Sequence, residues 1–428
     1  MFRDIIILIC IMSLAINVFG YENVELKSEN IQKEKSELTT LQELIDEALQ
    51  NNPEIKALSE SWEASKMRIP QAGAWKDPQI NFNIINLPAK QFSFGLEPMT
   101  GKQFLFTQQI PFPGKTSLKE KVAGEEENVF GELFSDKKNE IIKKVKTAYY
   151  NLYLIDKSIE ITEKNKSLLE SFIRIVSSKY EVGRGLQQDI LKSQVEISKI
   201  MEKLITLRQK RKSLTARINT LLNRSPETQI VKLAEIEQSQ FNLKNEELDK
   251  IAFETRPMLK AMENQIEKNE YLYKLAKKDY YPNFNVSLGY TQRDDRRDFF
   301  TTMFSLSIPI FINKKQSKKV EETAHTITAV RESYIGMKNE IQYKIRELRS
   351  NIEEYNELLE LLEQGIIPQA SQSLQSAIAG YQVDKVDFLT LLNNQLTLFN
   401  YEIEYYRVLS NYEKSLADLE FIIGKQLF

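Results

Sequence analysis

The residue types that carry most enzyme and metal chemistry are nearly absent from this sequence. Its 428 residues include one histidine, His325, and one cysteine, Cys10. A histidine-based acid–base pair or a zinc site of histidine and cysteine ligands needs more of these side chains than the chain has. Methionines that could bind a soft metal, among them Met67, Met99 and Met258, are scattered, and no glycine-rich phosphate loop is present. We therefore expect a protein that is not an enzyme and has no cofactor and no metal site.

The charge balance also argues against nucleic acid as a partner. Lys and Arg (58) nearly equal Asp and Glu (60), and no long cationic block interrupts the sequence. Glycine (14) and proline (12) are scarce, whereas 28% of the residues are charged. This composition is typical of long solvated helices rather than of a globule with many loops.

The first 20 residues have the features of a secretory signal peptide. Arg3 precedes an apolar run from Ile5 to Ile16, and a Val18–Gly20 stretch follows as the expected cleavage region. The apolar run is shorter than the roughly 20 residues that a membrane-spanning helix requires. Cys10 lies within this segment, so we expect the mature chain to have no cysteine. Residues 21–38 are polar and poor in apolar side chains, which predicts a flexible N-terminal segment.

Two long stretches carry apolar residues at steps that alternate between four and three. An alternation of this kind has a period of 3.5 residues, which is typical of helices that coil around a partner helix. The first stretch lies within a helix predicted from about Lys115 to Lys179, about 100 Å long at 1.5 Å per residue. A turn and a return helix follow, so we expect a long helical hairpin. The seam residues are Ile141, Val145, Ala148, Leu152, Ile155 and Ile159 in the first stretch and Ile341, Ile345, Leu348, Ile352, Tyr355, Leu359, Leu362 and Ile366 in the second.

Other segments alternate strictly between apolar and polar residues, which predicts strands with one apolar face. Residues 79–84 show this pattern, and we expect Phe92–Leu96 to continue it before a second strand through Phe104, Phe106 and Ile110. Strands of 9 to 11 residues can cross a bilayer when tilted, with an apolar face toward lipid. The alternative is an ordinary sheet with one face on a core. Four such strands cannot close a barrel by themselves, so a barrel would need several chains, and three chains would give twelve strands.

The whole arrangement occurs twice. Leu248, Ala252 and Pro257 follow Leu44, Ala48 and Pro53 at one constant offset, and this tandem duplication is the strongest pattern in the sequence. The predicted fold is α+β and mostly α. The predicted units are a first repeat (39–224, with a β-hairpin at about 78–112 and a helical hairpin at about 115–222), a connector (225–245), and a second repeat (246–428, with a β-hairpin at about 282–311 and a helical hairpin at about 314–424).

At this level of detail the sequence resembles the TolC-like outer-membrane efflux proteins over essentially the whole mature chain. The motifs that carry the resemblance are Ala48–Pro53 and its copy Ala252–Pro257, the turn Tyr180–Gly183, and the stretch from Pro368 to Leu389. The Gln109–Lys115 stretch is similar to the CusC/CzcC-like branch, which works with heavy-metal pumps. The resemblance implies a homotrimer with a twelve-stranded barrel in outer-membrane lipid and a twelve-helix periplasmic tunnel. It also implies two partners, a periplasmic adaptor (membrane fusion) protein and an inner-membrane pump of the RND type.

The same resemblance implies a gate at the periplasmic tips of the helical hairpins. Tyr381 matches the closing tyrosine of the family and Asp189 matches its hydrogen-bond partner, a charge-assisted latch. Tyr381 equally fits the apolar seam, and Asp189 equally fits an acidic residue at a helix N-terminus. The chain departs from the family at two places. Thr390 and Asn393 stand where the family has an acidic pair, and Val386 stands where an arginine is expected. Further gate candidates that could form a ring of charge in a trimer are Asp384 and Asp387.

The turns of the two hairpins are the expected docking sites for the adaptor. Glycines there also permit tight turning. The candidate docking residues are Tyr180, Gly183, Arg184 and Gly185 in the first turn and Val383 and Lys385 in the second.

The expected function is an exit duct of a tripartite efflux system, which conducts substrates passively. The alternative is a periplasmic adaptor or coiled-coil scaffold without a pore. A trimeric adhesin stalk is a weaker possibility, because both hairpins fold back on themselves.

Overall fold

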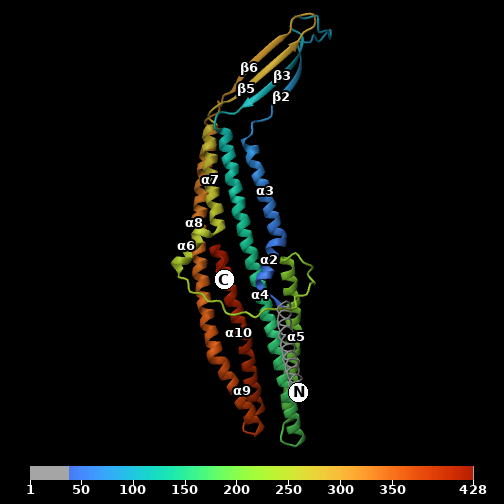
Figure 1. The fold of residues 1–428 in the computed structure, drawn as a ribbon, viewed down its shortest axis with the longest axis vertical. Coiled ribbons are helices and arrows are strands. Elements are labelled where there is room, and N and C mark those ends of the chain that lie inside the picture. The colour runs from blue at the N-terminus through green and yellow to red at the C-terminus, as the bar shows by residue number, and fades with distance from the viewer. Residues whose placement is uncertain (1–37, 428) are drawn as a thin grey trace, which may run out of the picture.

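The computed structural model describes residues 38–427, which form a long, narrow molecule (Figure 1). A β-sheet lies at one end and the turns of two helical hairpins lie at the other, with the long helices running between them. The predicted signal peptide and all but the last residue of the predicted flexible segment lie outside the described residues. Leu38, the last residue of that segment, is an exception to the prediction because it pairs in parallel with Lys232.

The sheet is antiparallel and has the strand order β2-β3-β5-β6. Its central pair joins the two repeats, since Phe104 of β3 faces Tyr290 of β5. The strands are β2 (Gln79–Ile85), β3 (Gly101–Ile110), β5 (Asn283–Gln292) and β6 (Phe299–Ser307). Both β2 and β6 are edge strands, and their outer backbone groups are paired with no other described strand.

The predicted continuation of the first strand through Phe92–Leu96 is wrong. Strand β2 ends at Ile85, and Asn86 adopts a left-handed conformation with φ of 51° that turns the chain away from the sheet. Pro88 follows and has no amide hydrogen for a ladder. Residues 86–100 therefore form an irregular connection, and Phe92 is 82% exposed within it.

Local sequence signals determine the helix boundaries of the first repeat. Thr40 and Glu43 form a reciprocal capping box at the start of α2, and the Asn52 side chain caps α3 by accepting from the Glu54 amide at 2.9 Å. Gly114, with φ of 85°, precedes α4. The helices are α2 (Leu41–Asn51), α3 (Pro53–Gly73), the 67-residue α4 (Lys115–Glu181) and α5 (Gln187–Leu221).

The second repeat has the same order, with one interruption in its long helix. Residues Leu361–Ile366 form a π-helical turn, η1, and the predicted seam residues Leu362 and Ile366 still pack in the hydrophobic core. Pro368 lacks the amide hydrogen that would bond the carbonyl four residues earlier, inside this turn. The elements are α6 (Asn245–Thr255), α7 (Pro257–Lys278), α8 (Gln316–Glu360), η1, α9 (Ile367–Gln382) and α10 (Phe388–Ile423). Helix α6 begins at the last residue of the predicted connector, which also contains the short strand β4 (Lys232–Leu233).

The helices pack along the predicted apolar seams. A large core cluster joins α4, α8 and α10, with fully buried residues such as Ile141, Leu152 and Ile345. A second cluster lies near the hairpin turns and contains Leu169 and Leu391. Within residues 38–427, every helix falls short of the combined length and hydrophobicity that a membrane crossing requires.

Candidate functional site

One face of the four-stranded sheet is apolar from edge to edge. The register aligns Phe82, Phe104, Tyr290 and Phe300 across all four strands, so their side chains lie on the same face. Phe300 is 87% exposed, which is a large area of apolar surface for a single chain to leave uncovered. Others on this face with high exposure are Ile80, Phe106, Phe284, Leu288, Phe304 and Leu306.

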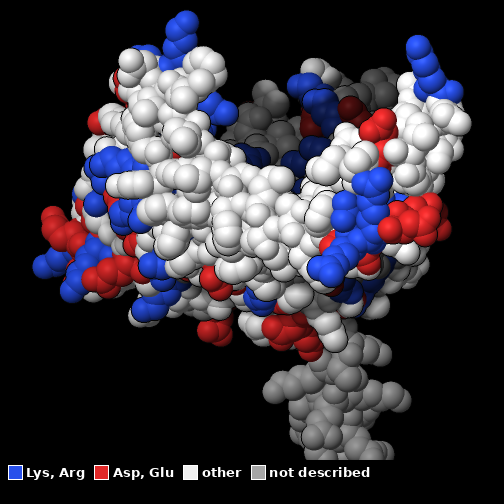
Figure 2. Space-filling view, turned by 90° about the horizontal axis from the view of Figure 1, so that it is seen from above, with Lys and Arg blue, Asp and Glu red and all other residues white. Residues whose placement is uncertain are grey.

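The opposite face of the sheet is mainly polar and is crosslinked by its own side chains. The Asn83 amide donates to Gln103 at 3.3 Å, and Gln103 donates to the Thr291 hydroxyl at 3.3 Å. The Thr107 and Ser287 hydroxyls are also paired, at 2.9 Å. Seen from the sheet end, uncharged side chains form a broad band across the molecule, with charged side chains along its borders (Figure 2). The sheet thus separates an apolar surface from a hydrogen-bonding one.

At the other end of the molecule, the two hairpin turns have the same backbone design. We call residues 182–186 the first tip and residues 383–387 the second tip. In the first tip the Arg184 amide donates to the Lys179 carbonyl at 2.8 Å, and Gly183 adopts φ of 74°. In the second the Lys385 amide donates to the Gly380 carbonyl at 2.9 Å. Both are helix C-terminal motifs that need one left-handed residue.

The left-handed residue of the second tip is not glycine but Asp384, with φ of 60°. Aspartate tolerates this conformation better than most side chains do. Its carboxylate forms an ion pair with Lys179 at the end of α4, and this contact holds the pKa of Asp384 below its usual range. The Lys179 ammonium also donates to the Tyr381 carbonyl and lies 4.3 Å from the centroid of the Tyr381 ring. Lys179 therefore joins the two tips.

The predicted latch between Tyr381 and Asp189 is not formed in this structure. The Tyr381 ring is 6% exposed and packs against Phe388 with ring centroids 5.9 Å apart, so the residue lies in the seam. Its hydroxyl has no hydrogen bond to Asp189. Burial, followed by the charges of Asp189 and Asp384, raises the pKa of Tyr381.

The other acidic gate candidates have distinct surroundings. Asp387 caps α10 by accepting from the Thr390 amide at 2.7 Å, which lowers the pKa of Asp387. Partial burial raises the pKa of Asp189, and the Asp387 charge adds to this increase while Lys192 opposes it. The structure thus brings Asp189 and Asp384 near Tyr381 and Asp387 near Asp189. The remaining two candidates, Thr390 and Asn393, are exposed along the first turns of α10.

The candidate docking residues surround the tips and are mostly exposed. Tyr180, Arg184, Val383 and Lys385 all present their side chains to solvent. Gly185 has a packing role, since a Cβ atom there would lie 2.8 Å from the Tyr180 amide nitrogen. The tips therefore offer an accessible surface on a tightly turned backbone.

The sequence did not indicate Lys179, whose side chain contacts both Asp384 and Tyr381 of the second hairpin. Its spacing and neighbours resemble those of many other lysines on the long helices, so no sequence signal distinguishes it. His325 is exposed on α8, and no group of three His, Cys, Asp or Glu side chains within residues 38–427 is arranged to hold a metal ion.

Comparisons with known proteins agree with this architecture. The sequence model of the family described as "Outer membrane efflux protein" matches residues 44–224 and 250–425. The cobalt-zinc-cadmium resistance protein CzcC of Cupriavidus metallidurans is 21% identical over 172 residues. That match covers 40% of this chain and 41% of CzcC, so it spans less than half of that relative.

Solved structures match over nearly the whole chain. CusC, described as forming a transmembrane channel, has a TM-score of 0.78 at 13% identity, covering 90% of this chain and 92% of CusC. The outer membrane protein VceC of Vibrio cholerae has a TM-score of 0.77 at 15% identity, covering 90% of this chain and 96% of VceC. At these identities the likeness concerns the fold alone. On the match of both repeats to the family model, the chain belongs to the outer membrane efflux protein family.

Proposed function

We propose that this protein is the exit duct of a tripartite efflux system, built from three copies of the chain. Each copy contributes four strands to a twelve-stranded barrel in the outer membrane and its helices to a periplasmic tunnel. Substrates pass through the water-filled interior by diffusion, and the hairpin tips control the periplasmic entrance.

The observation that carries this proposal is the sheet with two open edges and one exposed apolar face. Open edges are not tolerated in hydrocarbon, because each unpaired backbone group there costs several kcal/mol. Pairing of β6 with β2 of another copy removes every edge when the ring closes. The apolar face then contacts lipid, and the face with Asn83, Gln103 and Thr291 lines the water-filled interior.

The gate is proposed at the two tips. Lys179, Asp384 and the buried Tyr381 ring hold the second hairpin against the first, and separating the hairpins would break these contacts. Asp189 and Asp387 add negative charge beside them, which threefold repetition would turn into a ring at the entrance. The latch of the Tyr381 hydroxyl with Asp189, absent in this structure, is not part of the proposed gate.

The proposed partners are a periplasmic adaptor protein and an inner-membrane pump of the RND type. The exposed tip residues Tyr180, Arg184, Val383 and Lys385 are the proposed adaptor-docking surface. The relative CzcC is named for resistance to cobalt, zinc and cadmium. Together with the Gln109–Lys115 stretch, this relative supports a proposal of heavy-metal export, in which the pump and not the duct selects the cargo.

Reconstitution of the purified protein into planar lipid bilayers tests the proposal. A duct gives discrete conductance steps that are small while the tips are closed and larger when they are opened. A scaffold or adaptor without a pore leaves the bilayer resistance unchanged at every protein concentration, and this result would refute the proposed function.

A further inference from the structure

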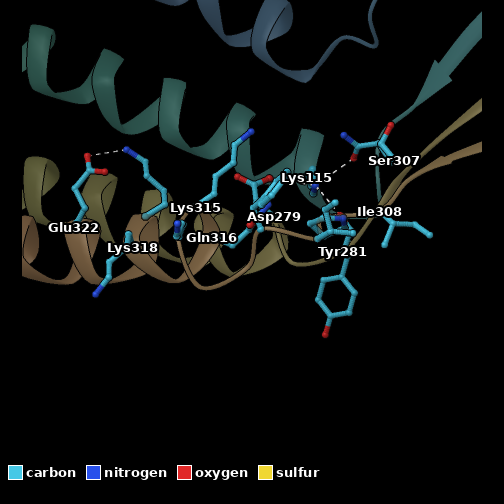
Figure 3. Close-up of a pocket in the computed structure, with 15 residues that line it drawn as sticks. Lys115, Asp279, Tyr281, Ser307, Ile308, Lys315, Gln316, Lys318 and Glu322 are labelled. Carbon is cyan, nitrogen blue, oxygen red and sulfur yellow. Dashed lines mark hydrogen bonds and ion pairs between the residues drawn. The ribbon is translucent and has the colours of Figure 1, made fainter.

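A cavity of about 920 Å³ lies where the sheet meets the helices (Figure 3). It is lined by residues at the end of β6, the start of α8 and the end of α7, and by the first residue of α4. Neither the proposed duct interior nor the tips account for it, since it lies at the opposite end of the helices from the tips.

One wall of the cavity continues the apolar face of the sheet. Ile308 and Ile310 follow Leu306 at alternate positions, so an extended chain places all three on the same side. Ile310 is 75% exposed. Beside them the rings of Phe112 and Tyr281 stack with centroids 4.5 Å apart, and the Tyr281 ring points away from the helices in Figure 3. Aromatic side chains of this kind are enriched where a membrane protein passes from lipid to water.

The other wall is cationic. Lys314 and Lys315 precede α8, and Lys318 and Lys319 occupy its first turn, which has no acidic residue. Cations at a helix N-terminus are unfavourable, because the backbone amides there already carry positive partial charge. The first turn of α8 also lacks a side-chain cap. This arrangement is stabilised when an anion binds between the lysines and the helix.

The lysines that line the cavity differ in whether they already have an acidic or polar partner. Lys318 and Lys319 pair with glutamates one turn later on the same helix, at 2.6 and 2.8 Å. Lys115 at the base of the cavity is held by the Tyr281 carbonyl, Asn283 and Asp279. Lys314 and Lys315 have no ion pair with any residue in the described part of the chain. They are the two cations available to a ligand.

An independent observation is a buried acceptor that also lines the cavity. Gln316 is 9% exposed, and its Oε1 atom has no hydrogen-bond partner among residues 38–427. A buried acceptor without a donor costs about 1–3 kcal/mol, so native structures rarely leave one. The site therefore calls for a ligand that has a hydrogen-bond donor close to its anionic group.

We propose that this cavity binds the headgroup of a glycerophospholipid in the periplasmic leaflet of the outer membrane. Lys314 and Lys315 hold the phosphate, Gln316 Oε1 accepts a hydrogen bond from the headgroup ammonium or hydroxyl, and the acyl chains lie along Ile308 and Ile310. The proposal rests on the placement of the sheet in the membrane under the proposed function. The site favours phosphatidylethanolamine, which has N–H donors, over phosphatidylcholine, whose quaternary ammonium has none.

Native mass spectrometry of the detergent-extracted full chain tests the proposal. The protein is titrated separately with phosphatidylethanolamine and with phosphatidylcholine, and the two lipids have identical acyl chains. We expect retained adducts with preference for phosphatidylethanolamine. The double variant Lys314→Gln/Lys315→Gln should weaken the binding of both lipids by about thirtyfold, because each lysine near the membrane surface contributes about 1 kcal/mol. Gln316→Leu, similar in volume but without polar atoms, should abolish the preference for phosphatidylethanolamine. The matched control Lys210→Gln/Lys212→Gln removes two exposed lysines of α5 and should change neither the affinity for the lipids nor the preference for phosphatidylethanolamine.

Several outcomes would overturn the lipid site. The first is an equal loss of lipid in the α5 control, and the second is saturation of the site by inorganic phosphate alone. The third is the formation of adducts on the monomer that disappear on assembly. The last result would mean that a second copy covers the cavity. Because adduct formation is measured apart from conductance, a conducting protein without lipid preference refutes only this site. A non-conducting protein refutes the proposed function.

Discussion

Lys179 at the end of α4 forms an ion pair with Asp384, the left-handed residue of the second tip, 205 positions later in the chain. The same ammonium donates to the Tyr381 carbonyl, so one side chain of the first repeat holds two groups of the second. In the proposed duct this contact has to break before the two hairpins separate. It is therefore the natural place to test the gate.

Lys179→Met should raise single-channel conductance in planar bilayers. The substitution keeps an unbranched side chain one atom shorter and removes the ion pair, the carbonyl contact and the interaction of the ammonium with the Tyr381 ring. Because the Asp384 carboxylate is solvent-exposed, we expect the open fraction to change only by a factor of a few. Asp384→Asn should also raise the conductance, and asparagine tolerates the left-handed conformation as aspartate does. Lys166→Met is the control, since Lys166 pairs with Glu170 on its own helix at 3.3 Å.

Conductance should depend on pH in two opposite phases. The pKa of Asp189 is raised above the ordinary value of 3.8, so on acidification this group is protonated first and its repulsion of Asp387 disappears, which favours the closed tips. The pKa of Asp384 is lowered below 3.8, so its ion pair is present above that pH and is lost only as pH falls through the lowered pKa. Conductance should first fall and then rise. Asp189→Asn should remove only the first phase, and a single monotonic phase in the unmodified protein would contradict these assignments.

Tyr381→Phe should leave the conductance close to that of the unmodified protein, because the ring and the backbone carbonyl make the contacts and the hydroxyl has no bond to Asp189. Tyr381→Ala should loosen the second tip, because truncating a buried aromatic side chain costs about 3 kcal/mol. Hydrogen exchange of the amides in residues 383–387 measures this loosening. A large increase in conductance for Tyr381→Phe would contradict this expectation and would support a latch formed by the Tyr381 hydroxyl and Asp189.

A buried ion pair in the middle of the molecule should matter for stability rather than for gating. Arg256 lies 3.2 Å from Asp136 and stacks on Phe421 at 4.0 Å, yet Asp136 Oδ1 lacks a hydrogen bond within the described part of the chain. Arg256→Met leaves the Asp136 carboxylate buried without its cation and should lower the free energy of unfolding by about 3–5 kcal/mol. The double variant with Asp136→Leu should recover most of this loss in denaturant titrations in detergent. Equal destabilisation in both variants would show that the packing of Arg256 dominates.

Sequence patterns predicted the helices and the faces of the strands because these depend on local periodicity. Pro113 and Gly114 correctly indicated that the long helix begins at Lys115, and strict alternation correctly put Phe104 and Tyr290 on one face of the sheet. Similarity between the repeats did not extend to every detail. The π-helical turn before Pro368 has no counterpart in α4, where the helix is continuous.

The candidate site was less predictable because its contacts join residues far apart in the chain. Asp384 and Tyr381 were candidates from their positions near a turn, but their connection to Lys179 depends on how two hairpins pack. The orphaned acceptor of Gln316 depends on the burial of its amide, which no spacing reveals. Phe92–Leu96 shows the opposite error, since an apolar pattern alone predicted a strand that the left-handed Asn86 and Pro88 prevent.

The mass of the detergent-extracted particle shows whether three chains close one barrel. Native mass spectrometry should give a particle of three chains that dissociates only under strongly denaturing conditions and that precipitates when the detergent is removed. A monomer that stays soluble without detergent would rule out the trimeric barrel, because its exposed sheet face and its edge strands β2 and β6 would then have no partner.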